Sequence, residues 1–158
     1  KGLKLCFVGD GNNVAHSLMF GGAKLGIHVT VASPKGYEPK SVAVQQAVED
    51  AKVTGARIEV TSDPTEGVKN ADVVYTDVWA SMGQESEAES RKQVFRPYQV
   101  NKKLMAQARS DAIFMHCLPA HRGEEVTDEI IDDPSSVVFQ QAENRLHVQK
   151  AIMYQLMK

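Results

Sequence analysis

Residues 3–13 have the sequence LKLCFVGDGNN, and this stretch decides the fold. Residues 3–9 form a short, largely apolar run that ends in glycine, which is typical of a buried β-strand. From residue 13 to residue 25 apolar side chains recur at helical spacing, and Gly26 is placed to end a helix. A strand that passes through a glycine turn into a helix is the first half of a β-α-β unit.

The same alternation of strand and helix continues along the chain. Residues 81–96 are polar and charged without a clean apolar period, so we expect a long mobile loop with some helix there. Asn101 and Thr127 stand where they would cap short helices. We expect further strands at residues 28–32, 57–61, 71–77, 112–116 and 136–139, and further helices at residues 41–54, from 63, at 101–108, at 127–131 and from about 142.

This order predicts an α/β fold with a doubly wound, mostly parallel sheet flanked by helices, in a Rossmann-like three-layer α/β/α arrangement. No internal repeat, linker or low-complexity tract interrupts the order, so we expect residues 1–158 to form a single domain. The predicted inward faces of the long helices are Val14, Leu18 and Leu25, then Val44, Val48 and Ala51, and finally Val148, Ala151, Ile152 and Leu156.

Composition excludes several classes of protein. Hydrophobic residues make up 42% of the chain and charged residues 24%, which argues against disorder. The net charge is −2 with scattered basic residues, so we expect no nucleic-acid partner, and no apolar run approaches the roughly 20 residues of a membrane span. Two isolated cysteines predict a reducing compartment, which is the cytoplasm, or the mitochondrial matrix in a eukaryote. The chain opens on Lys1-Gly2 and enters a strand at once, so we expect it to be a piece of a longer protein.

Ligands of doubly wound sheets bind beyond the carboxyl ends of the strands, so the turns after those strands are the candidate sites. The first is the glycine turn at residues 9–13. It matches a dinucleotide fingerprint only in part, because Val14 stands where the third glycine would be and no acidic residue closes the second strand. Asn12 and Asn13 are instead suited to holding a small polar ligand, the alternative being that one of them only caps the helix.

The second candidate turn follows the buried strand at residues 71–77. Asp77 at the end of that strand is suited to pair with a ligand ammonium group. Ser81 and the Met82 backbone are placed to hold a carboxylate, and Gly83 to act as a hinge. The alternative is that Asp77 caps a turn.

The third candidate turn is His116-Cys117-Leu118-Pro119. Cys117 at a strand end is suited to act as a nucleophile, a general acid or base, or a polar contact, although a free cysteine is also a common buried hydrophobe. His116 equally fits a satisfied core histidine. The histidines are scattered, and neither a C-x-x-C nor an H-E-x-x-H motif occurs, so we expect no metal site. The absence of G-x-S-x-G argues against a serine hydrolase.

Four motifs in order together resemble the ornithine carbamoyltransferases: G-D-G-N-N at 9–13, D-V-W-A-S-M-G at 77–83, H-C-L-P-A-H-R-G-E-E-V at 116–126 and A-E-N-R at 142–145. The aspartate-using branch of the family is expected to carry H-P-L-P at 116–119. The resemblance implies a two-domain, typically trimeric enzyme. Its first domain holds carbamoyl phosphate through S-T-R-T and H-P-x-Q stretches, and neither occurs here. The chain resembles the second, ornithine-binding domain, so we expect the carbamoyl-phosphate domain to lie outside it and the chain alone to be inactive.

The resemblance also implies how L-ornithine is held. Asn13 would bind its α-carboxylate or α-amino end, and Asp77 would pair with its α-ammonium group. Ser81 and Met82 would close over the amino acid as the S-M-G loop.

Carried over in the same way, Cys117 and the Leu118 backbone would lie by the δ-amino group and the carbamoyl carbon. Arg145 would polarise the carbamoyl oxygen, where charge develops during transfer. The δ-ammonium must lose a proton before it attacks, and we expect Cys117 to accept or relay it, since a free thiol has a pKa of about 8.5. No cofactor is implied.

Three alternatives remain at this point. A related carbamoyltransferase would use an acylated ornithine or a diamine such as putrescine. A Rossmann-like module would bind a nucleotide. A non-catalytic domain would bind ornithine as a regulatory ligand.

Overall fold

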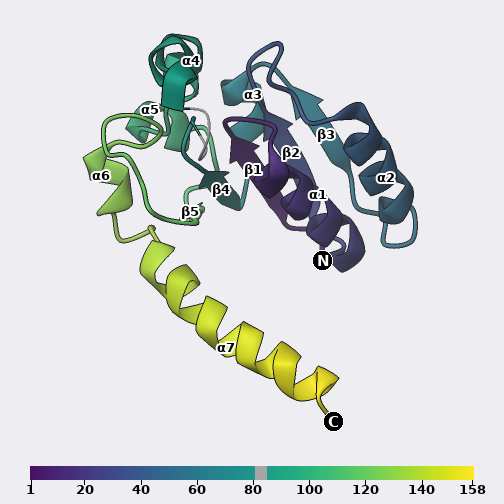
Figure 1. Cartoon of the computed structure of the whole chain (residues 1–158). Helices are drawn as coiled ribbons and strands as arrows, with labels where there is room; N and C mark the ends of the chain where they lie inside the picture. The colour runs from purple at the N-terminus through teal and green to yellow at the C-terminus, as the bar shows by residue number, and fades with distance from the viewer. Residues whose placement is uncertain (81–84) are drawn as a thin grey trace.

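The computed structural model describes residues 1–80 and 85–158. Its centre is a sheet of five strands, all parallel, in the order β3-β2-β1-β4-β5 (Figure 1). Helices follow the strands along the chain, so the predicted doubly wound α/β fold is confirmed. The strands are β1 (Lys4–Val8), β2 (His28–Ala32), β3 (Ile58–Thr61), β4 (Val73–Thr76) and β5 (Ile113–His116).

Several helix ends lie at local sequence signals. Asn12, Asp63 and Asn101 each accept a backbone N–H bond at a helix start, and Gly26 ends the first helix in the left-handed conformation that glycine tolerates. Thr127 occupies the predicted cap position, but its side chain makes no capping bond. The helices are α1 (Asn13–Leu25), α2 (Ser41–Ala51), α3 (Pro64–Val68), α4 (Ala88–Phe95), α5 (Lys102–Met105), α6 (Asp128–Ile131) and α7 (Val138–Leu156), with 3₁₀ turns η1 (Glu85–Glu87) and η2 (Arg96–Tyr98).

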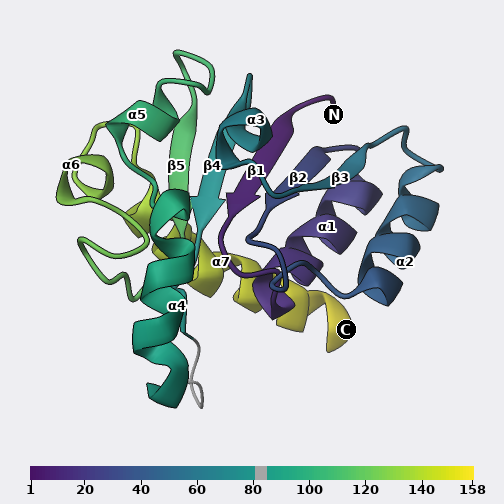
Figure 2. The same cartoon turned by 90° about the horizontal axis from the view of Figure 1, so that it is seen from above.

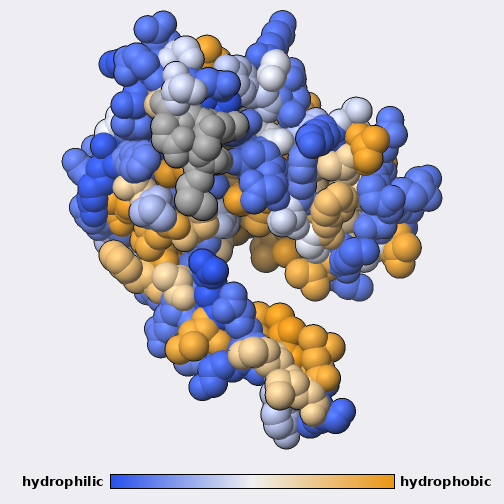
Figure 3. All heavy atoms as spheres, viewed as in Figure 1, coloured by the Kyte–Doolittle hydropathy of each residue, from blue (hydrophilic) through white to orange (hydrophobic). Residues whose placement is uncertain are grey.

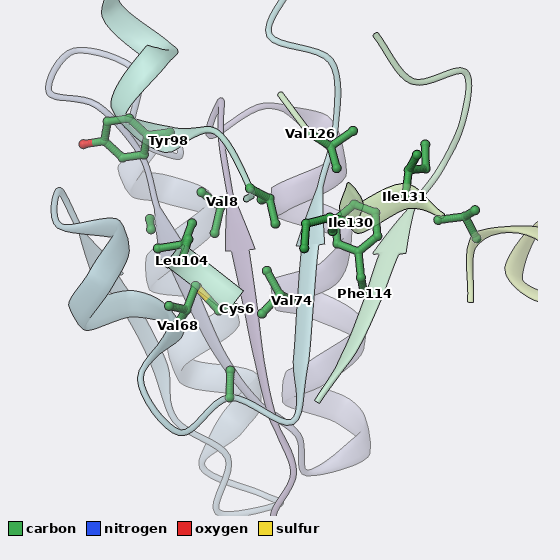
Figure 4. Packing of buried hydrophobic residues seen from close by; sticks show 14 residues of the cluster. Cys6, Val8, Val68, Val74, Tyr98, Leu104, Phe114, Val126, Ile130 and Ile131 are labelled. Atoms are coloured by element: carbon green, nitrogen blue, oxygen red, sulfur yellow. The ribbon is translucent and has the colours of Figure 1, made fainter. Parts of the chain in front are cut away.

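Two apolar clusters cover the two faces of the sheet. Successive strand residues point to opposite faces, and accordingly Phe7 packs in one cluster while Cys6 and Val8 pack in the other. Helices α1 and α2, which lie side by side in Figures 1 and 2, supply Ala15, Met19 and small alanines to the Phe7 cluster. In the second cluster the strand residues meet side chains from α3, α5 and α6, as Figure 4 shows for Val68, Leu104 and Ile130.

The predicted inward faces of the helices were partly wrong. Leu25 is 65% exposed and Val48 is 42% exposed. The buried residues of α1 are Ala15, Met19, Gly22 and Ala23, and those of α2 are Ala43, Ala47 and Ala51. The physical reason is close packing: a Cβ on Gly22 would lie 2.3 Å from Cγ2 of Val29, so α1 approaches the sheet too closely at this position for a side chain.

Two further expectations about the elements need correction. The segment from residue 85 to residue 98 is almost entirely helical, since it forms η1, α4 and η2 rather than a loop with some helix. Residues 136–139 form no strand: Ser136 makes a single bridge with Phe114, and α7 already begins at Val138. Buried Val138 packs into the second core cluster, so the apolar run belongs to a helix start.

Helix α7 projects from the β5 edge of the sheet, away from the other helices (Figure 1). Val138 is its buried residue, and the predicted inward residues Val148, Ile152 and Leu156 are 55%, 52% and 81% exposed. Figure 3 shows hydrophobic residues along this helix in contact with solvent. Among the described residues, no helix combines the length and apolarity needed to cross a bilayer.

Gly11 is required by a close approach of two backbone segments. Its N–H donates to the Tyr37 carbonyl oxygen at 2.8 Å, and a Cβ on Gly11 would lie 2.2 Å from the nitrogen of Pro39. The loop after β2 therefore packs directly against the backbone of the turn at Gly11.

We predict that Gly11→Ala lowers the free energy of unfolding by about 1–3 kcal/mol or more, because the methyl group overlaps fixed backbone. Gly21→Ala is the matched control. Gly21 lies within α1 with open space around its Cα, so alanine should stabilise the helix by about 0.5–1 kcal/mol. Chemical denaturation of both variants measures the difference, and equal stability of the two would contradict the contact.

Candidate functional site

The register of the sheet brings three strand ends together. Val8 of β1 is paired with Thr76 of β4, and Thr76 with His116 of β5. The hydroxyl of Thr76 also donates to the Val8 carbonyl oxygen at 2.6 Å, which ties the ends of β1 and β4. The turns that begin at Gly9, Asp77 and Cys117 therefore lie side by side. The β1–β4 boundary is also the point where the strand order reverses, the usual ligand crevice of such sheets.

Asp77 and Cys117 contact each other directly at this edge. The Cys117 thiol donates to Oδ1 of Asp77 at 3.0 Å, and the Val78 N–H donates to the same oxygen at 2.8 Å. Asp77 is 9% exposed as a residue, so it lies almost out of water. Asp77 thus binds its neighbour's amide as well as the thiol, and the alternative that it caps a helix or turn stays a prediction.

The environment of Cys117 keeps its thiol protonated. Burial, followed by the hydrogen bond to Asp77 and the negative charge of that carboxylate, raises the pKa of Cys117 to about 12. The expectation of an ordinary thiol pKa near 8.5 is therefore corrected. At neutral pH Cys117 is a hydrogen-bond donor, and its partly buried side chain also packs against the Phe7 cluster, so the buried-hydrophobe alternative applies in part.

The turn after β5 is built on a buried histidine and a buried glutamate. Both His116 and Glu125 are 0% exposed, and Nε2 of His116 lies 3.2 Å from Oε1 of Glu125. The Leu118 N–H donates to Nδ1 of His116 at 2.8 Å, and the His121 N–H donates to Oε1 of Glu125 at 2.6 Å. Glu125 was missed by sequence reasoning, because it stands in a polar loop with no period that marks it as buried.

The two asparagines of the first turn have different roles. Oδ1 of Asn12 accepts the Val14 N–H at 3.0 Å, so Asn12 is the helix cap. Asn13 is the first residue of α1 and is exposed at the same sheet edge. The capping alternative thus applies to Asn12, and the predicted ligand role of Asn13 remains a prediction.

Arg91 on α4 is a buried charge that sequence reasoning missed. It is 3% exposed, forms an ion pair with Asp10, and donates from Nε to the Trp79 carbonyl oxygen at 2.6 Å. Its guanidinium lies 4.8 Å from the centroid of the Tyr37 ring. Arg91 therefore links the turn after β1 to the turn after β4. Burial raises the pKa of Asp10, although the Arg91 charge opposes the shift.

Arg145 does not meet the other predicted site residues through a hydrogen bond or ion pair among the described contacts. It is exposed on α7, one helical turn beyond Gln141. Gln141 itself reaches the site: its Oε1 accepts the His116 N–H at 3.1 Å, and its Nε2 donates to the Tyr75 hydroxyl at 2.9 Å. The predicted residues Ser81 and Met82, with Gly83, lie outside the described residues.

Two clusters of candidate metal ligands occur in the described part of the chain. The ligand atoms of Asp77, His116 and Cys117 lie within 4.8 Å of one another, and so do those of His121, Glu124 and Glu125. In the first cluster Nδ1 of His116 accepts from a backbone amide and the thiol is bonded to Asp77, so these donors are engaged within the protein.

The chain matches one known protein family over almost its whole length. Residues 1–156 match the family described as aspartate/ornithine carbamoyltransferase, Asp/Orn binding domain. The chain belongs to the aspartate/ornithine carbamoyltransferase family.

Individual members of the family are close in sequence and in structure. An ornithine carbamoyltransferase of Thermococcus kodakarensis is 63% identical over 97% of this chain and 49% of its own length. The structure of ornithine carbamoyltransferase from Pyrococcus furiosus is similar with a TM-score of 0.93, at 61% identity, over 97% of this chain and 49% of that one. That of the anabolic enzyme from Campylobacter jejuni gives a TM-score of 0.93 at 40% identity, over 98% and 51%. The chain thus spans about half the length of the relatives it matches.

We predict that the Cys117 thiol is unreactive toward alkylating reagents. Below a pH of about 12 the group is protonated, so iodoacetamide should modify it much more slowly at pH 8–9 than a free cysteine with a pKa of about 8.5. Asp77→Asn removes the negative charge and the strong acceptor that raise the pKa, so modification at the same pH should become faster.

Mass spectrometry of the Cys117 peptide separates this reaction from that of Cys6, which is fully buried. Asp111→Asn is the matched control, because Asp111 is an exposed carboxylate that precedes the amino-terminal end of β5, whereas Cys117 follows its carboxyl end. Modification of Cys117 at the rate of a free cysteine, with no response to Asp77→Asn, would contradict the assigned pKa.

Proposed function

We propose that this chain is the ornithine-binding part of an ornithine carbamoyltransferase. The complete enzyme would transfer the carbamoyl group of carbamoyl phosphate to the δ-amine of L-ornithine and release citrulline and phosphate. The observation that carries the proposal is the almost buried Asp77 carboxylate bonded to Cys117 at the strand-order reversal. The names of the close relatives support it.

Asp77 is suited to the α-ammonium group of ornithine. A carboxylate withdrawn from water pairs more strongly with a cation than an exposed one does. Among the described residues its hydrogen-bond partners are a thiol and a local amide, both at Oδ1, and an incoming ammonium would pair with the other carboxylate oxygen. Asn13, exposed at the start of α1, would contact the α-carboxylate or α-amino end, and Ser81 with Met82 would close over the amino acid.

Cys117 would act beside the δ-amine as a polar contact and proton relay. The negative charge of Asp77 is one cause of its raised pKa, and an ammonium bound at Asp77 neutralises that charge. Ornithine binding therefore lowers the pKa of the thiol toward its ordinary value. An amine that attacks an activated carbamoyl carbon needs no covalent enzyme intermediate, so the thiol is not required as a nucleophile.

The carbamoyl oxygen and the departing phosphate gain negative charge during transfer, and cationic donors stabilise that charge. Arg145 would supply one, with the exposed guanidinium on α7 turned toward the carbamoyl oxygen in the complete enzyme. The backbone of Leu118 would contact the reacting end of ornithine. We propose no metal or organic cofactor.

The rest of the enzyme would hold carbamoyl phosphate. The S-T-R-T and H-P-x-Q stretches that serve this purpose in the family do not occur in these 158 residues. Exposed apolar residues on α7 offer that other part a surface to pack on (Figure 3). We propose a homotrimer or a multiple of trimers, located in the cytoplasm, or in the mitochondrial matrix of a eukaryote.

We predict that Asp77→Asn in the complete enzyme raises the KM for ornithine by about 10–100-fold, because a charge-assisted contact is worth about 1.5–3 kcal/mol. Carbamoyl phosphate binding should stay near normal. Asp111→Asn is the control, and citrulline formation is the measurement. N-acetylornithine, which lacks a free α-ammonium, and putrescine, which lacks the whole α-end, should be poor substrates of the unmodified enzyme. If Asp77→Asn weakened ornithine use and carbamoyl phosphate binding equally, the assignment of Asp77 to the α-ammonium group would be overturned.

We also predict that the 158-residue chain alone forms no measurable citrulline from ornithine and carbamoyl phosphate. Isothermal titration should still detect ornithine, with weak affinity that Asp77→Asn abolishes. Citrulline formation by the purified chain would refute the proposal that the rest of the enzyme is needed to hold carbamoyl phosphate. Saturable NAD binding without ornithine binding would favour the nucleotide-binding alternative instead.

A further inference from the structure

The turn at residues 116–119 is held by two polar side chains that are both shielded from solvent. His116 and Glu125 are both 0% exposed, and they face each other at 3.2 Å. The two atoms approach closely without forming an aligned hydrogen bond, and among the described residues the second oxygen of Glu125 has no hydrogen-bond partner. Burying such groups is costly, and an apolar pair of similar volume would pack the same space at lower cost.

The hydrogen bonds around His116 define its tautomer. The Leu118 N–H donates to Nδ1 at 2.8 Å, so Nδ1 carries no proton and the ring proton sits on Nε2. Nε2 is the atom that faces Glu125. The carboxylate therefore selects the tautomer whose other nitrogen accepts the Leu118 amide, which is the way that a second residue orients a histidine in many enzymes.

The amide so held belongs to a residue in an unfavourable conformation. Leu118 has a φ of 55°, in the left-handed region that side chains other than glycine rarely adopt. Holding such a residue costs about 1–3 kcal/mol, and it persists only where its surroundings impose it. Glu125 supplies a second restraint, since its Oε1 also accepts the His121 N–H at 2.6 Å and closes the turn from its far side.

We propose that His116 and Glu125 are positioning residues for carbamoyl transfer. Glu125 fixes the tautomer of His116, His116 holds the Leu118 amide, and the pair together keeps Cys117 and the Leu118 backbone at the reacting end of the substrate. This role rests on the proposed function. Asp77 directly follows β4 and is hydrogen-bonded to Cys117 and Val78 rather than to the pair, so the pair should govern turnover rather than the contact with the α-ammonium group.

The test compares Glu125→Gln with Glu125→Leu in the complete enzyme. Glutamine keeps an oxygen that accepts from the His121 N–H and faces Nε2 of His116, whereas leucine has a similar volume and no acceptor. We expect Glu125→Leu to lower kcat by up to about 100-fold with an ornithine KM within about 3-fold of the unmodified enzyme, since a small displacement of reacting groups costs that much. Glu125→Gln should restore most of the turnover.

Val29→Ala is the control for lost stability, because Val29 is buried in β2 under the opposite face of the sheet. It should lower Tm and leave kcat unchanged. Hydrogen exchange of the 117–123 peptide supplies a readout without substrate, and exchange should become faster in Glu125→Leu but not in Glu125→Gln. Unchanged turnover in Glu125→Leu, or equal losses in both variants, would overturn the proposal.

If Glu125→Leu does not fold, His116→Asn replaces it. The Oδ1 of asparagine lies near the position of Nδ1 and keeps an acceptor for the Leu118 amide, so His116→Asn should retain more turnover than His116→Ala. The reverse order would overturn the proposal. If the unmodified enzyme forms no citrulline, the proposed function fails, while hydrogen exchange still decides whether the pair holds the turn.

Discussion

Parallel pairing in register is the constraint on which the site depends. Val8, Thr76 and His116 occupy one row across β1, β4 and β5, so the residue that follows each of them is delivered to the same edge. Parallel strands need a crossover between them, and the helices that make those crossovers cover both faces of the sheet. Ligands of such sheets bind beyond the carboxyl ends of the strands. The contact between Asp77 and Cys117, 40 residues apart in the chain, is a direct consequence.

The sequence was sufficient to predict the fold and the residues at the strand ends, but not the packing around those residues. Short apolar runs that end in glycine or a polar turn identify strands, and Asp77 and Cys117 follow such runs. The inward face of α1 was misjudged because apolar size favoured Leu25. The backbone approach at Gly22, 2.3 Å from a Val29 methyl group if a Cβ were present, is a tertiary fact that no local period contains.

Buried charges were the other failure, for a related reason. Arg91 stands in a run of polar residues and is buried because Asp10, 81 residues away, supplies the opposite charge. Glu125 is buried because His116 and a backbone amide surround it. A charged residue in a polar stretch is ordinarily solvated, so its burial follows only once the fold has placed a partner beside it.

The partners of the buried carboxylates indicate which one is available to a substrate ammonium. Asp10 is paired with the Arg91 guanidinium, and removing that cation would leave a buried charge uncompensated. Glu125 faces a histidine and a backbone amide deep in the protein, out of reach of solvent. Asp77 is bound by a neutral thiol and one local amide, and it keeps a small opening to solvent. Of these three acids it is the one that neither pairs with a guanidinium nor is closed off completely from solvent. A cation that arrives at this edge can pair with Asp77, and the pairing would offset one of the causes, after burial, that hold the proton on Cys117.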